Sequence, residues 1–152
     1  MGANLDEQLG LRLQEEHKTL MQLTQVLKEH IAVMPSANLG PWFQGLRVAY
    51  DRLYAHVERC VAMKEKDGYL EVILKERPTL SKQVASIKSE HGQLLKMGQT
   101  VHDELAATRP EDYLLIGEAC ARVQRFISVV AQHDQRENMI VLFALNQDLG
   151  GY

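Results

Sequence analysis

Four histidines are spaced so that four consecutive helices would each contribute one of them: His17, His56, His91 and His133. Glu137 follows the last histidine by four residues, and this spacing places both side chains on one face of a helix. Imidazole and carboxylate groups inside an apolar interior need partners, because an unsatisfied polar group there costs several kcal/mol. One shared metal ion would satisfy all of them, so the pattern predicts a metal site in the core.

The surroundings of these histidines indicate an internal repeat. Residues 15–20 are similar to residues 89–94, and residues 55–60 are similar to residues 132–137. The repeat places Cys60 where the second copy has its glutamate, and we therefore include Cys60 among the candidate ligands.

Other metal motifs are absent from the sequence. No histidine has an acidic residue three positions before it, as a ferritin-type E-x-x-H site requires, and the H-E-x-x-H pattern of metalloproteases does not occur. Mixed imidazole and carboxylate ligands suit iron, zinc or manganese, so ligand type alone does not select the metal.

Length and composition indicate one domain, residues 1–152, large enough to bury a core. The net charge is −3 and basic residues are scattered, so nucleic acid is not an expected partner. Cys60 and Cys120 are the two cysteines, which excludes a disulfide framework. No secretory signal and no apolar run of about 20 residues is visible, so we expect a cytoplasmic protein that does not enter a membrane.

Proline and glycine divide the chain into helical segments. Breaks fall at residues 35–41, at Asp67-Gly68, and at the prolines at positions 78 and 110. The expected helices cover residues 4–34, 41–66, 79–107 and 111–147, with a short piece at 69–76.

A seven-residue apolar repeat predicts the inward face of each long helix. The rows are apolar except for His17, Thr24, His56, Cys60, His91, His133 and Glu137. Short connections between such helices favour an all-α fold, an antiparallel up-down-up-down four-helix bundle.

The order of histidines and glutamate resembles the hemerythrin-like, HHE cation-binding domain family over nearly the whole chain. The Glu-His pairs at residues 16–17 and 90–91, the segment at 67–70, and the ending from Arg136 to Gly151 carry the resemblance. It implies an up-down four-helix bundle that holds a non-haem di-iron centre, with histidine and bridging carboxylate ligands. It also implies a small diatomic ligand, oxygen or nitric oxide.

The second helix departs from the family pattern, H-x-x-x-E. If the pattern starts at His56, Cys60 replaces the glutamate; if it starts four residues later, Cys60 replaces the histidine and Lys64 the glutamate. Both registers remove one carboxylate bridge. A lysine ammonium in the same space would repel metal ions.

The expected function is therefore non-haem iron binding, with His17, His56, Cys60, His91, His133 and Glu137 as metal ligands. The alternative is a degenerate, metal-free bundle that acts as an interaction or structural module, as a homodimer or with an unknown protein partner. A third option is an oxidoreductase that acts on peroxide.

Two further expectations concern charged residues near the histidines. The run Lys64-Glu65-Lys66-Asp67 is expected to be a solvated helix end. Glu16 and Glu90 are expected to face solvent, with hydrogen bonding to ligand histidines as the alternative.

Overall fold

The computed structural model describes residues 2–66 and 69–149, which fold entirely into helices and short connections. The prediction of an all-α chain is confirmed. The helices are α1 (Gly2–Ala32), α2 (Leu39–Lys66), α3 (Tyr69–Glu76), the 3₁₀ turn η1 (Pro78–Leu80), α4 (Ser81–Ala107) and α5 (Tyr113–Leu149). Their ends lie within two residues of the predicted ones, and the predicted break at Asp67-Gly68 lies outside the described residues.

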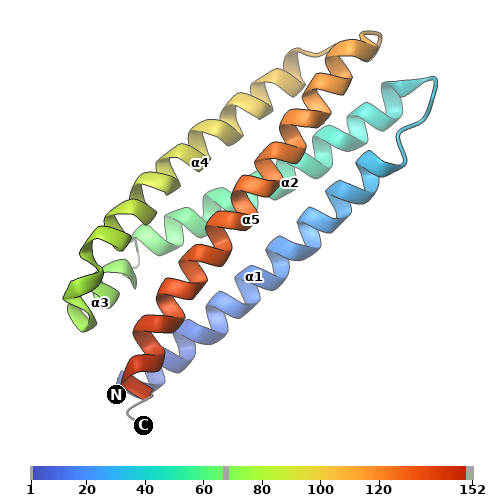
Figure 1. Cartoon of the computed structure of the whole chain (residues 1–152). Coiled ribbons are helices and arrows are strands. Elements are labelled where there is room, and N and C mark those ends of the chain that lie inside the picture. Colours follow the sequence, from blue (N-terminus) through green and yellow to red (C-terminus); the bar gives the residue numbers. More distant parts are fainter. Residues whose placement is uncertain (1, 67–68, 150–152) are drawn as a thin grey trace.

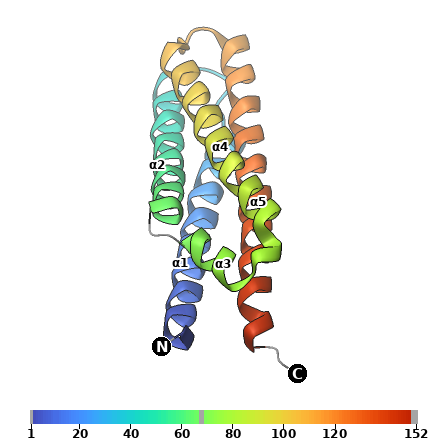
Figure 2. The same ribbon diagram turned by 90° about the vertical axis from the view of Figure 1, so that its left-hand side faces the viewer.

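Four long helices lie side by side, and successive ones run in opposite directions along the molecule (Figure 1). α1 packs against α2 and α5, and α4 packs against the same two helices. The short α3 lies at the end where α2 stops and α4 begins, next to the lower halves of the long helices (Figure 2). Each long helix therefore presents one face to the common interior.

The apolar rows of the sequence form two separate clusters in that interior. The larger one fills the half near the α4–α5 connection, with Phe43, Leu46, Tyr50 and Phe126 almost fully buried. The smaller one lies near α3. It contains Leu13, Tyr69, Leu70, Ile73, Leu80, Val84, Ile87, Val141 and Ala144. A layer of polar side chains separates the two clusters.

Close packing of α2 on α4 determines how these two helices lie against each other. A Cβ atom added at Gly98 would lie 2.2 Å from the Tyr54 ring, so a side chain at this position is excluded. The Tyr50 hydroxyl donates a hydrogen bond of 2.6 Å to the Gly98 carbonyl, and the Tyr54 hydroxyl donates one of 2.9 Å to the Leu95 carbonyl. These contacts fix the register of α2 against α4 one to two turns above the polar layer.

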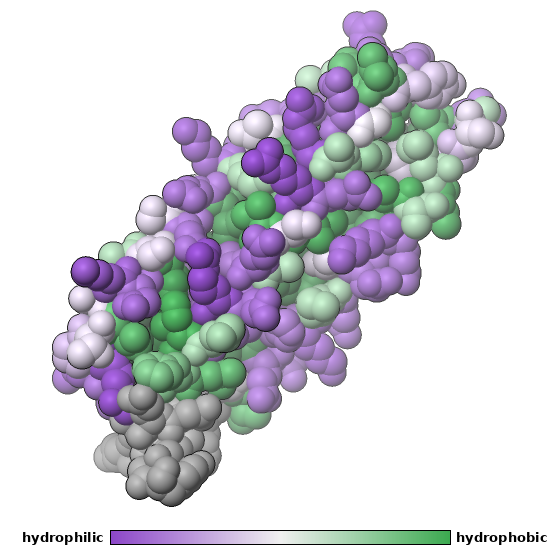
Figure 3. Space-filling model, in the orientation of Figure 1, coloured by the Kyte–Doolittle hydropathy of each residue, from purple (hydrophilic) through white to green (hydrophobic). Residues whose placement is uncertain are grey.

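The outer faces of the helices are mixed. Hydrophilic and hydrophobic side chains are interspersed along the face shown in Figure 3. Within residues 2–66 and 69–149, none of the helices combines the length and the apolar character that crossing a bilayer demands.

Candidate metal centre

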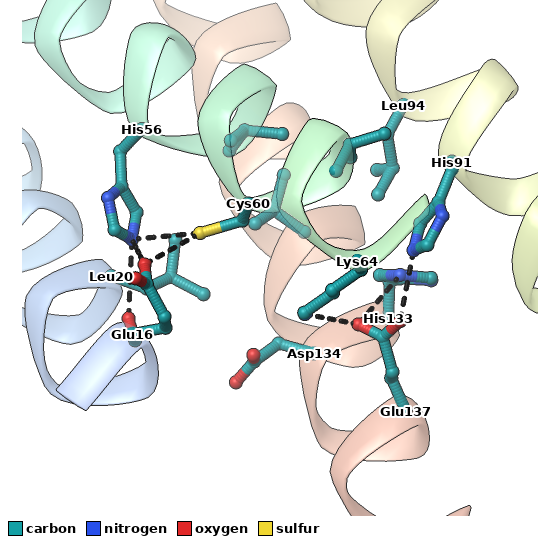
Figure 4. Close-up of a pocket in the computed structure, with 13 residues that line it drawn as sticks. Glu16, Leu20, His56, Cys60, Lys64, His91, Leu94, His133, Asp134 and Glu137 are labelled. Atoms are coloured by element: carbon teal, nitrogen blue, oxygen red, sulfur yellow. Dashed lines mark hydrogen bonds and ion pairs between the residues drawn. The ribbon is translucent and has the colours of Figure 1, made fainter. Parts of the chain in front are cut away.

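A small cavity lies in the polar layer and is open on one side. It has a volume of about 30 Å³, and side chains from all four long helices line it. Its apolar walls come from the larger core cluster, whereas its polar groups come from all four long helices, with three of them, His56, Cys60 and Lys64, on successive turns of α2 (Figure 4). The polar residues are Glu16, His56, Cys60, Lys64, His91, His133, Asp134 and Glu137.

The first polar cluster consists of His91, His133 and Glu137 and is fully buried; we call it the His–His–Glu cluster. The heptad spacing of α4 and α5 turns these residues inward, one turn below Leu94 and Val130. His91 Nε2 lies 3.0 Å from Glu137 Oε2, and His133 Nε2 lies 3.5 Å from Glu137 Oε1. Two imidazole nitrogens and one carboxylate thus converge on the same point.

The outer nitrogens of both histidines meet a second set of carboxylates. His91 Nδ1 lies 2.9 Å from Glu65 Oε1, and His133 Nδ1 lies 2.7 Å from Glu90 Oε1. A carboxylate that binds Nδ1 orients the ring so that Nε2 faces inward. His133 Nε2 is buried and has no hydrogen-bond partner in the structure. Both rings are therefore oriented as metal-binding histidines usually are.

Lys64 from the end of α2 adds a cation to this cluster. Its side chain is only 7% exposed, and its ammonium donates a short hydrogen bond to Glu137 Oε1. The expectation of a solvated helix end is wrong for Lys64, because α2 carries this turn under α3 and into the interior. The positive charge that a buried carboxylate requires is here supplied by the protein itself.

The environment shifts the ionisation of the cluster. Burial would raise the pKa of Glu137, but the His133 and His91 imidazoles beside it and the charge of Lys64 hold this pKa well below its usual range. Burial would lower the pKa of His133, yet the neighbouring carboxylates of Glu137 and Glu90 raise it. Burial, and next the charge of Glu137, raise the pKa of the Tyr69 phenol. Glu137 is consequently an ionised carboxylate at neutral pH.

The second polar cluster consists of Glu16 from α1 and of His56 and Cys60 from α2; we call it the Glu–His–Cys cluster. Cys60 Sγ lies 3.0 Å from Glu16 Oε2 and 3.3 Å from His56 Nε2, and His56 Nε2 lies 3.5 Å from Glu16 Oε2. His56 Nε2 also lies 3.2 Å from the Glu16 carbonyl. Burial and the Glu16 carboxylate raise the pKa of Cys60 to about 12, so the sulfur carries its proton.

The structure does not bring His17 into either cluster. Its side chain is 48% exposed, and its Nδ1 lies 2.5 Å from Asp134 Oδ2. The prediction that His17 belongs to the inward row of α1 is wrong, because the helix turns Glu16 toward the cavity instead. Glu16 and Glu90 are both partly buried and bound to neighbouring side chains, so the expectation that they face solvent is wrong as well.

Several residues of the site were missed or misplaced by sequence reasoning. Glu65 is predicted from the sequence to lie in a solvated helix end, and Tyr69 enters the prediction only as part of the segment at 67–70, not as a site residue. The internal repeat could have indicated Glu16 and Glu90, because each of them directly precedes an equivalent histidine in its copy of the repeat. No comparable signal exists for Glu65, because its contact with His91 joins the end of α2 to the middle of α4.

One of the three comparisons with known proteins gives a match. The family model described as the Hemerythrin HHE cation binding domain matches residues 12–145, and this range includes both clusters. The search of curated proteins and the search of solved structures give no match. Because the family model covers most of the sequence, the chain belongs to the hemerythrin HHE cation-binding domain family.

Proposed function

We propose that this protein binds one non-haem iron ion through His91, His133 and Glu137, and that a small diatomic molecule occupies an open position beside it. The observation that carries the proposal is the convergence of three buried ligand atoms on one point, with His133 Nε2 lacking any other partner. Cation binding is the property by which the family is described. In this proposal the four long helices form the up-down-up-down bundle of that family.

The residues of the His–His–Glu cluster suit one iron ion better than two. Two neutral imidazoles and one carboxylate supply nitrogen and oxygen atoms of the type that iron accepts. Glu65 and Glu90 hold the rings in place from outside. A second ion on the other side of Glu137 would meet the Lys64 ammonium, and like charges in a buried site repel strongly. The protein thus offers a three-ligand, mononuclear site.

Iron in such a site supplies an open coordination position at which oxygen or nitric oxide binds. The protein residues provide the space and shield it from bulk water. The cavity volume of about 30 Å³ corresponds to about one molecule the size of water. The apolar side chains of Leu94 and Val130 cover it on the side of the larger core cluster. Access is therefore restricted to small ligands.

Reconstitution with ferrous iron under anaerobic conditions tests the proposal. We expect about one iron per chain in the unmodified protein and a loss of iron in His91→Gln and His133→Gln. His102→Gln is the matched control, since His102 lies on the surface and pairs with Asp51. Retention of iron in both core variants, or an equal loss in the control, would contradict the proposal.

A second candidate function is favoured by the pairing of Lys64 with Glu137. This ion pair neutralises the buried carboxylate without any metal. In that case the chain is a metal-free bundle that acts as an interaction or structural module. Absence of iron after reconstitution, together with a melting temperature that a chelator leaves unchanged, is the result that selects this candidate.

A further inference from the structure

We propose that Glu16, His56 and Cys60 form a separate site for a single thiophilic divalent cation, and that zinc is the ion they match best. This site lies on the opposite wall of the cavity from the His–His–Glu cluster (Figure 4). Its existence does not depend on iron binding at that cluster.

The three ligand atoms are already spaced as a tetrahedral ion requires. Zinc bonds of about 2.0 to 2.3 Å to oxygen, nitrogen and sulfur correspond to about 3.3 to 3.5 Å between ligand atoms in a tetrahedron. The observed edges are 3.0 Å for Cys60 to Glu16, 3.3 Å for Cys60 to His56 and 3.5 Å for His56 to Glu16. An ion can therefore enter after shifts of a few tenths of an ångström.

The chemistry of the ligands selects the ion. A thiolate is a soft ligand that favours zinc over calcium, magnesium or manganese, and imidazole also suits zinc. Binding replaces the Cys60 proton with the metal, as happens when a thiol becomes a zinc ligand. It also requires the His56 proton to move from Nε2, which faces the Glu16 carbonyl at 3.2 Å, to Nδ1, so that Nε2 can bind the ion. Thiolate and the Glu16 carboxylate then balance the two positive charges of the ion, and neutral His56 completes a site without net charge.

Lys64 keeps the two clusters distinct. Its side chain extends between Cys60 and Glu137, and its ammonium is bound to Glu137 (Figure 4). No carboxylate bridges the Glu–His–Cys cluster to the His–His–Glu cluster within the part of the chain that is described. An ion at Cys60 is therefore held by α1 and α2 alone, with its fourth position open to water in the cavity.

Solvent reaches the Glu–His–Cys cluster from the side of α1. The Glu16 side chain is 31% exposed, whereas His56 is only 4% exposed. A hydrated ion can first meet Glu16 at the surface and then exchange water for the imidazole and sulfur ligands behind it. The Glu–His–Cys cluster is thus the more exposed of the two clusters that line the cavity.

Cobalt(II) substitution tests the site, because cobalt replaces zinc and gives thiolate charge-transfer absorption in the near ultraviolet. We expect the full-length protein to bind one cobalt with this absorption and to lose it on addition of one equivalent of zinc. Cys60→Ser should abolish the absorption and weaken zinc binding by more than about 100-fold, beyond the effect of losing an outer partner. Cys120→Ser is the matched control for the second cysteine and should retain both properties.

A double variant, Lys64→Met with Glu137→Gln, separates this site from the iron proposal. It removes both members of the buried ion pair together and so leaves no unpaired charge. We expect it to lose iron but to retain the thiolate absorption of cobalt. Absence of the absorption in the unmodified protein, its survival in Cys60→Ser, or its loss in the folded double variant would each overturn the proposal. Circular dichroism establishes the folded state of every variant.

Discussion

The two halves of the polar layer come from corresponding positions of the internal repeat, yet they differ in chemistry. In the α4–α5 half, His91 and Glu137 turn inward and meet in a buried cluster. In the α1–α2 half, the equivalent His17 turns outward and Cys60 replaces the glutamate. Repeated sequence and repeated helix pairing have thus produced a hard nitrogen–oxygen cluster on one side and a thiol-containing cluster on the other.

This difference shows how the negative charge of Glu137 is balanced when position 60 carries no second carboxylate. Without a carboxylate at Cys60, the interior holds a single fully buried carboxylate, Glu137, among the residues whose burial is described. Lys64 supplies one positive charge to it from the α2 side. The thiol at Cys60 and the buried ammonium of Lys64 are both expected to reduce the number of hard cations that the layer holds.

The largest expected effect follows from breaking the Lys64–Glu137 pair in metal-free protein. Glu137→Leu leaves a buried ammonium without its carboxylate, and such a change lowers the free energy of unfolding by about 3–5 kcal/mol. Lys64→Met combined with Glu137→Leu should restore stability, because an apolar replacement of a whole buried pair is often neutral or stabilising by about 1–4 kcal/mol. Urea unfolding in the presence of a chelator measures both. A double variant no more stable than the single one would show that the pair does not carry this charge balance.

The second effect concerns metal-dependent stability and separates the two halves. An ion at 100 times its dissociation constant raises the free energy of unfolding by about 2.7 kcal/mol if it binds only the folded chain. We expect ferrous iron to stabilise Cys60→Ser but not His133→Gln, whereas zinc should still stabilise His133→Gln, in which the Glu–His–Cys cluster is intact. The melting temperatures of the two variants, each measured with each of the two ions, give four comparisons. Identical responses of the two variants to both ions would mean that the layer is one site.

The third effect is a change in the number of iron ions bound per chain. It tests whether the family pattern H-x-x-x-E in α2 starts at His56 or at Cys60. Lys64, not Cys60, contacts Glu137, so the position facing the His–His–Glu cluster is Lys64. Cys60→His with Lys64→Glu should therefore raise iron content by about one ion per chain, since it supplies a second carboxylate and removes the ammonium. Cys60→Glu alone should leave the content unchanged. An increase with the single variant would favour the register that starts at His56.

The helices and most of the inward rows could be predicted from the sequence, because apolar spacing and proline positions determine them locally. The inward row of the third predicted long helix is buried throughout, from Leu80 in η1 to Leu105 in α4. The predicted inward row of α1 is wrong at His17, because Glu16 faces the cavity instead. The burial of Lys64 was also not predictable, because it depends on the long-range contact with Glu137. The role of the clusters as metal sites stays a prediction.

The smallest expected effect is on the pH dependence of stability in metal-free protein. The two halves of the polar layer are expected to respond in different pH ranges. The pKa of Glu137 is lowered in the folded state, so its contribution is fully present above about pH 4.5 and is lost as the pH falls further. The pKa of His133 is raised, so its contribution is present below about pH 6.5 and is lost as the pH rises through the folded-state value. The α4–α5 half therefore favours mildly acidic conditions.

Cys60 acts at the alkaline end. Its folded-state pKa of about 12 exceeds the ordinary 9.0, so its contribution is complete below about pH 9 and is lost as the pH rises toward 12. We expect Cys60→Ser to flatten only the alkaline decline. Lys64→Met with Glu137→Gln should flatten the acidic decline and also reduce the loss that His133 causes above about pH 6.5, because Glu137 raises the pKa of His133. Urea midpoints measured from about pH 3 to about pH 11 test both. Since one group lies in each half, loss of the acidic decline in Cys60→Ser would show that the two clusters titrate as a single unit.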